Sequence, residues 1–271
     1  MTADLYLSQP FAQHALIAGA LVAIVCGLIG PFIVSRKMSF AVHGTSELAF
    51  TGAAAGLLAA NNPILGAYVG SLVVASVLGM LGNKERERDS TIGVILAFGL
   101  GLGVLFLSFY KGFATQATNI LFGNIFGVGT GQLLLLSVVC IVVFITMLVI
   151  FRPLLFASVD SEVARAKGVP VKALGIIFLF VLALTVTSAA QIVGTLLVLS
   201  LTITPAAAAQ YLAKKPLIIT LLSVAFALVA SIGGILASLA SGSIKPSILV
   251  TIISFGIHAI ARILAPVSRA A

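Results

Sequence analysis

The sequence predicts an all-α fold, a polytopic bundle of eight or nine transmembrane helices that forms a single domain over residues 1–271. Hydrophobic residues make up 61% of the chain and charged residues only 8%, and the mean hydropathy is +1.25. A water-soluble domain has about 25% charged residues, so a soluble globular protein is excluded. The apolar runs do not alternate with polar residues as β-barrel strands do, which favours helices.

Nine apolar segments approach the length of about 20 residues that a helix needs to cross a bilayer. They are residues 11–35, 41–60, 64–83, 91–110, 131–151, 172–190, 192–212, 216–239 and 246–264. The second segment contains His43 and Glu47, and only a small turn predicted at residues 189–191 separates the sixth from the seventh. The sequence therefore leaves the count at eight or nine.

The positions of the basic residues predict the orientation of the bundle. When the nine segments are threaded alternately, thirteen of the fifteen Lys and Arg residues fall on one side. They are Arg36, Lys37, Lys84, Arg86, Arg88, Arg152, Arg165, Lys167, Lys172, Lys214, Lys215, Arg262 and Arg269, and Lys111 and Lys245 fall opposite. The positive-inside rule places the N-terminus outside and the C-terminus in the cytoplasm. Cations spread in this way between apolar runs do not indicate nucleic-acid binding.

Glu47 is the single acidic residue inside a hydrophobic segment. A carboxylate there costs about 2.5 to 3.5 kcal/mol on insertion scales, so it normally faces a cavity or a partner on an ion path. His43 precedes it by four residues, which places both side chains on one helix face. Imidazole and carboxylate together suit divalent manganese, zinc or iron. In the alternative interpretation Glu47 pairs with Arg36 or Lys37, and His43 caps the helix start.

Residues 156–172 contain the signals of a short cytoplasmic helix. Asp160 or Ser161 can cap its start, Glu162 lies in the first turn, and Gly168 ends it before Pro170. A transporter that receives force from an attached motor would place such a helix on its inner face. A plain interfacial helix is the alternative.

The sequence has no glycine-rich phosphate-binding loop and no Gly-Lys dipeptide, so we expect no ATP hydrolysis by this chain. It also has no Ser/His/Asp or Cys/His constellation that would indicate an enzyme.

Three blocks together resemble the membrane permease family of ABC importers for manganese, zinc and iron. They are SRKMSFAVHGTSELAFTG at 35–52, VDSEVARAKGVPV at 159–171 and VGTLLVLSLTITPAAAA at 193–209. Where this family usually has Asp and then His four residues later, the chain has His43 and then Glu47, the same ligand chemistry in reversed order. The resemblance therefore implies that His43 and Glu47 are metal ligands.

The resemblance also implies the partners and the location. It implies a second permease copy in a homodimer, cytoplasmic ATP-binding subunits, an extracellular metal-binding receptor, and the cytoplasmic membrane of a prokaryote. Asp160, Glu162, Ala164 and Gly168 would belong to the coupling segment that fits the ATPase. The metal would be cargo, and no permanently bound cofactor is expected. The competing hypothesis is an ion-coupled secondary carrier that works without ATP and uses Glu47 as its coupling group.

Overall fold

A computed structural model describes residues 9–80, 85–110, 123–195 and 197–269, with side chains described outside 85–92 and 266–269. Within these ranges the chain is helical, with no strand. The long helices are α2 (Pro10–Ser35), α3 (Ser39–Ala60), α4 (Pro63–Met80), α5 (Glu85–Phe109), α7 (Thr130–Val159), α9 (Val171–Val193), α12 (Pro216–Ser241) and α13 (Pro246–Arg269). The short ones are η1 (Ile125–Gly127), α8 (Ser161–Ala166), α10 (Val198–Thr202) and α11 (Thr204–Leu212). The all-α prediction is confirmed.

Each segment of the sequence prediction corresponds to a helix or a helix pair among the described residues. Six of these helices are long and apolar enough to cross a membrane, namely α2, α4, α7, α9, α12 and residues 246–265 of α13. Helix α5 is apolar only over residues 93–109, and α10 with α11 forms a short apolar stretch over residues 198–212. Helix α3 is not among these six helices. It carries His43, Glu47 and several hydroxyl side chains, which lower its hydropathy. The chain is therefore a multi-pass membrane protein.

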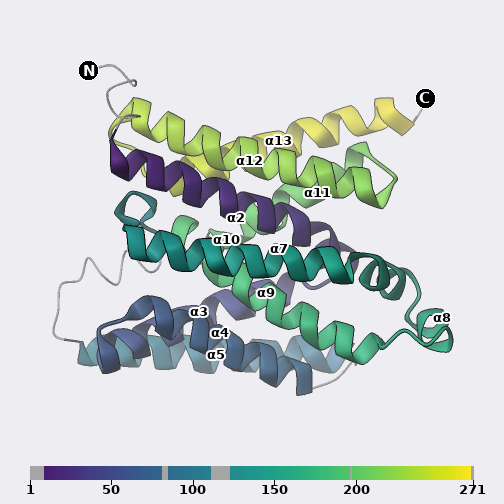
Figure 1. Ribbon diagram of the computed structural model, residues 1–271, viewed down its shortest axis with the longest axis horizontal. Helices are drawn as coiled ribbons and strands as arrows, with labels where there is room; N and C mark the ends of the chain where they lie inside the picture. Colours follow the sequence, from purple (N-terminus) through teal and green to yellow (C-terminus); the bar gives the residue numbers. More distant parts are fainter. Residues whose placement is uncertain (1–8, 81–84, 111–122, 196, 270–271) are drawn as a thin grey trace.

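The helices lie in three groups (Figure 1). Helices α2, α12 and α13 form one side, α3, α4 and α5 form the other, and α7 and α9 lie between them. Large apolar side chains cover the outer faces, with Val149 74% exposed on α7 and Ile263 72% exposed on α13. Such a surface suits lipid, because soluble proteins rarely expose large contiguous apolar patches to water.

Glycines let the helices of the α3, α4 and α5 group approach closely. Gly52 and Gly56 of α3 face Gly66 and Gly70 of α4, and a Cβ atom on any of them would overlap backbone atoms of the facing helix. The Thr51 hydroxyl donates a hydrogen bond of 2.6 Å to the Gly99 carbonyl of α5. Because lipid offers little hydrophobic drive between helices, close backbone packing is the main attraction available here.

Replacing Gly66 by alanine is expected to destabilise the protein by about 1 to 3 kcal/mol, because the new methyl group would overlap the Gly52 carbonyl. Gly101→Ala on α5 is the matched control, since no atom lies within 4 Å of the position its Cβ would take. That control should be neutral or slightly stabilising, because alanine is the better helix former. Thermal unfolding of the two variants in detergent measures the difference, and equal transitions would contradict the packing account.

The predicted turn at residues 189–191 is wrong. Helix α9 continues to Val193 and ends at Gly194, whose φ of 92° is open to glycine but strained for other residues. The predicted seventh segment, 192–212, is not one helix but α10 and α11, which are separated at Ile203. Pro205 at the start of α11 explains this break, because proline fits the first turn of a helix but not its interior.

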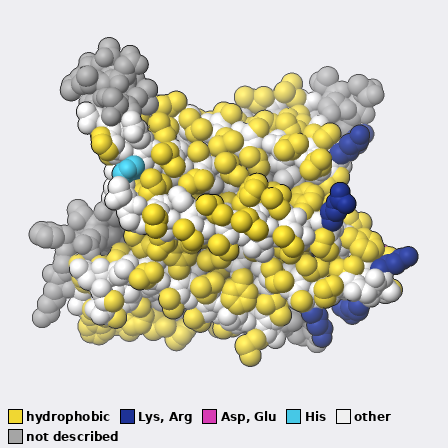
Figure 2. Space-filling view, in the orientation of Figure 1, with side chains coloured by type: hydrophobic (Ala, Val, Ile, Leu, Met, Phe, Trp, Pro, Cys, Tyr) yellow, Lys and Arg dark blue, Asp and Glu magenta, His cyan; other side chains and the backbone are white. Residues whose placement is uncertain are grey.

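Basic side chains gather at one end of the bundle, the end at which α8 lies (Figure 2). Arg36 and Lys37 follow the end of α2 there, and Lys214 and Lys215 precede α12. Lys245 lies at the other end, between α12 and α13. Lys84 and Lys111 lie outside the described residues, as do the side chains of Arg86, Arg88 and Arg269.

Candidate functional site

Helix α3 carries the two metal ligands that the sequence predicts. The helix is rich in alanine and contains no proline, and it ends where Asn61 adopts the left-handed conformation with a φ of 51°. The Asn61 N–H then donates to the Leu57 carbonyl at 3.2 Å, which satisfies one of the carbonyls left open at a helix end. The group formed with α4 and α5 holds α3 in place through the glycine contacts described above.

Glu47 is buried in this helix, with only 5% of its surface exposed. Its Oε2 atom is fully buried and has no hydrogen-bond partner. An unpaired buried carboxylate oxygen is costly, so such an atom in a native protein indicates a functional role or a partner such as water or an ion. The arrangement suits a carboxylate that binds a cation.

His43 lies one helical turn before Glu47 and is half-buried. The spacing of four residues within α3 places the two side chains on one helix face, one turn apart. The structure thus places the two predicted ligands together. Among the residues with described side chains, however, no group of three or more His, Cys, Asp and Glu side chains could hold a metal. The pair could supply two ligands, so a metal held there would need further ligands from water or from another chain.

Arg36 was the alternative partner for Glu47. Its guanidinium carbon lies 5.3 Å from the centre of the Phe178 ring of α9, in a cation–π arrangement. This contact joins the Arg36 side chain to α9. Burial of Phe178 at 0% exposure makes the aromatic face a fixed support for the guanidinium group.

Helix α8 begins as the sequence predicts, with Asp160 as its N-cap. One oxygen of Asp160, Oδ1, accepts hydrogen bonds from the backbone N–H groups of Glu162 at 3.0 Å and Val163 at 2.9 Å. The carboxylate also interacts favourably with the positive end of the helix dipole.

The end of α8 is formed by Gly168, whose φ is 82°. Its N–H donates to the Arg165 carbonyl, and the Val169 N–H donates to the Ala164 carbonyl, both at 3.0 Å. This pair of bonds is the Schellman motif, which needs a left-handed residue. Ala164 is fully buried against the bundle, while Glu162, Val163 and Gly168 are exposed. The segment is a rigid exposed helix beyond the ends of α7 and α9 (Figure 1).

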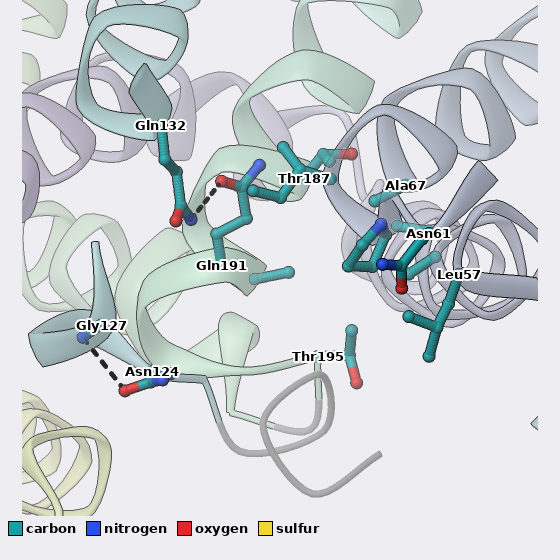
Figure 3. Close-up of a pocket in the computed structure, with 14 residues that line it drawn as sticks. Leu57, Asn61, Ala67, Asn124, Gly127, Gln132, Thr187, Gln191 and Thr195 are labelled. Atoms are coloured by element: carbon teal, nitrogen blue, oxygen red, sulfur yellow. Dashed lines mark hydrogen bonds between the residues drawn. The ribbon is translucent and has the colours of Figure 1, made fainter. Parts of the chain in front are cut away.

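A separate cavity of about 340 Å³ opens at the end of the bundle opposite α8 (Figure 3). Its walls come from the end of α3, the start of α4, η1, the start of α7 and the end of α9. The polar residues that line it are Asn61, Asn124, Gln132, Thr187, Gln191 and Thr195. Neither His43 nor Glu47 lines it.

The sequence prediction missed this cavity. Gln191 falls where the sequence predicts a turn. In the structure the Gln132 amide donates to Gln191 Oε1 at 3.1 Å, and Asn124 Oδ1 accepts from the Gly127 N–H at 3.1 Å. The sequence did offer one signal for the cavity. Gln132 and Gln191 lie near the ends of apolar segments, where a buried amide needs a hydrogen-bond partner.

The described residues form a helical bundle with an apolar perimeter, a buried carboxylate one turn from a half-buried imidazole and an exposed helix at its basic end, and these features fit a membrane permease. The chain belongs to the ABC 3 transport family, whose model matches residues 8–264. The predicted family is therefore confirmed.

The relatives and the solved structures agree with this assignment. The chain is 30% identical over 233 residues to the manganese transport system membrane protein MntC of Halalkalibacterium halodurans, covering 86% of this chain and 80% of that protein. It is 28% identical over 225 residues to the high-affinity zinc uptake system membrane protein ZnuB of Haemophilus influenzae, covering 83% and 86%. The structure of PsaBC from Streptococcus pneumoniae in complex with Fab matches with a TM-score of 0.87 and 29% identity, over 98% of this chain and 96% of that chain.

Proposed function

We propose that the chain is the permease subunit of an ATP-driven importer that moves a divalent transition-metal ion across the cytoplasmic membrane of a prokaryote. The observation that carries this proposal is the buried Glu47 carboxylate, whose Oε2 atom has no hydrogen-bond partner, one helical turn after His43, in a chain whose relatives include manganese and zinc transport proteins. A nitrogen and an oxygen ligand suit manganese, zinc and iron alike. Two ligands bind weakly enough for the ion to be released on the inner side.

The ATPase is a separate cytoplasmic subunit in this proposal. The sequence contains no phosphate-binding loop, and the exposed helix α8 offers a rigid surface for such a partner. Asp160 and Gly168 fix the shape of that helix, Glu162 faces the partner, and Ala164 anchors the helix on the bundle. ATP-driven closure of the motor would then be transmitted through α8 to α7 and α9.

A second permease copy completes the metal site. One chain supplies one imidazole and one carboxylate, and two copies related by a two-fold axis would supply two of each. An extracellular metal-binding receptor would deliver the ion to this pair of copies. The basic end of the bundle faces the cytoplasm by the positive-inside rule. Nine crossings, with α10 and α11 together as the seventh, put the N-terminus outside and the C-terminus inside.

Metal flux into proteoliposomes tests the driving force. The complex of permease and ATPase should accumulate manganese, zinc or iron only when ATP is supplied on the cytoplasmic side. The ion-coupled carrier predicts the opposite, that the purified chain alone accumulates metal when a pH gradient is imposed. Accumulation by the chain alone, without ATP, would replace the importer by the carrier.

A further inference from the structure

Basic side chains flank the contact between α2 and α7 at the basic end of the bundle. The Phe32 ring of α2 meets the Phe151 ring of α7 edge to face, with the ring centroids 5.4 Å apart. Arg36 follows Phe32 by one turn at the end of α2, and Arg152 directly follows Phe151. Since each residue advances a helix by about 1.5 Å, the two cations lie within about one turn of the same level. Arg152 and Lys37, the residue after Arg36, are both exposed.

Arg152 lies where α7 leaves the apolar part of the bilayer. Residues 130–151 of α7 contain no charged side chain, and a helical segment of this length can cross the hydrocarbon core of roughly 30 Å. Arg152 is the first charged residue after this segment, and the helix continues to Val159. The Arg152 guanidinium group is therefore at the level of the lipid headgroups.

An exposed apolar stripe leads along α7 away from Arg152. Leu148, Ile145 and Ile141 precede Arg152 by four, seven and eleven residues, which places all four side chains on one helix face. The three apolar side chains are 57%, 55% and 53% exposed. The stripe is about 16 Å long, close to the half of the hydrocarbon core that one leaflet supplies. One acyl chain can lie along it while the phosphate of the same lipid reaches Arg152.

The charges at this level favour an anionic lipid. Of the acidic side chains that the structure describes, Glu47 lies in α3, Glu162 lies in α8, and Asp160 bonds to the backbone of α8. None of the three is on α2 or within α7. Arg36 adds a positive charge over the Phe178 ring. Guanidinium groups bind phosphate oxygens through charge-assisted hydrogen bonds, and basic groups at this depth attract anionic lipids.

We propose that an anionic phospholipid binds to this face of α2 and α7, in the leaflet at the basic end of the bundle. Its phosphate binds Arg152 and Lys37, and one acyl chain lies on the stripe formed by Leu148, Ile145 and Ile141. The site is separate from His43 and Glu47, and the inference does not depend on the identity of the cargo. Because α7 ends at the N-cap of α8, the bound lipid also fixes the depth of the helix that carries α8.

Native mass spectrometry of the purified full-length chain tests the proposal. The delipidated chain is titrated in detergent with phosphatidylglycerol, which is anionic, and separately with phosphatidylcholine of the same acyl chains, which has no net charge. The native chain should bind phosphatidylglycerol roughly 25-fold more tightly, since each of two cations contributes about fivefold. Arg152→Gln with Lys37→Gln should reduce this preference to less than fivefold and leave phosphatidylcholine binding unchanged.

The matched control is Arg165→Gln with Lys167→Gln. It removes the same charge from exposed positions at the end of α8, so the lipid preference should stay native. Should the double variant at the site fail to fold, Arg152→Gln alone replaces an exposed side chain and should weaken phosphatidylglycerol binding roughly fivefold. Glycerol 3-phosphate at millimolar concentration has the phosphate without acyl chains and should not displace the lipid.

Three results would overturn the proposal. Equal binding of the two lipids by the native chain would show that the site does not select an anionic lipid. An equal loss of preference in the control would indicate attraction by the total charge of the basic end, and displacement by glycerol 3-phosphate would indicate a site for soluble anions. If the Arg152 and Lys37 variant keeps its lipid preference but no longer co-purifies with the ATPase, these cations bind the partner protein and not a lipid.

Discussion

Replacing Glu47 by glutamine is expected to reduce ATP-driven metal uptake roughly 100-fold, which corresponds to about 2.7 kcal/mol. Glutamine has nearly the same shape but no charge, so the buried site loses its anionic ligand while α3 keeps its packing. The buried Oε2 atom has no hydrogen-bond partner within the protein, so the substitution breaks no bond to that atom. Uptake into proteoliposomes at a fixed metal concentration measures the effect.

His43→Ala should also reduce ATP-driven metal uptake, because it removes the nitrogen ligand one turn away from Glu47. The control is His14→Ala on α2. His14 is a half-buried histidine whose Nδ1 atom lies 3.2 Å from the Val128 carbonyl, and it is far from α3 in the sequence. Uptake in that control should remain near the native level. Native uptake in both the Glu47 and the His43 variants would remove the metal-site claim.

Replacing Gly168 by valine is expected to abolish coupling between ATP hydrolysis and uptake while metal binding persists. A valine at a φ of 82° is strained by roughly 1 to 2 kcal/mol, so the turn after α8 must change shape. The Schellman bonds to Ala164 and Arg165 would be lost with it. A coupling helix in the wrong shape no longer fits the ATPase.

Two measurements separate this effect from unfolding. The Gly168→Val variant should bind metal with native affinity and co-purify poorly with the ATPase. Lys172→Ala, at the start of α9 and exposed, is the control that should leave co-purification unchanged. Native coupling in Gly168→Val would show that α8 is a plain interfacial helix.

The sequence predicted the features that depend on local chemistry. The caps of α8 follow from Asp160 and Gly168, since capping requires only residues a few positions apart. The helical pairing of His43 and Glu47 follows from their spacing of four residues. Long apolar runs predicted the helices, because each needs only its own composition.

The features that the sequence could not predict depend on contacts between distant segments. Helix α9 continues past the predicted turn and ends at Gly194, which adopts a positive φ. The cavity joins residues of α3, α7 and α9, and only their packing shows that Gln132 and Gln191 meet. Arg36 similarly finds Phe178 across the bundle. Spacing along the chain contains no information about such pairs.

The most direct test of the metal site is the coordination of Mn²⁺ in the permease–ATPase complex, observed by pulsed electron paramagnetic resonance. We expect coupling to an imidazole nitrogen that disappears in His43→Ala, together with much weaker binding of this ion in Glu47→Gln. Nitrogen coupling that persists in His43→Ala, or unchanged affinity in Glu47→Gln, would contradict the claim that this pair receives the transported ion.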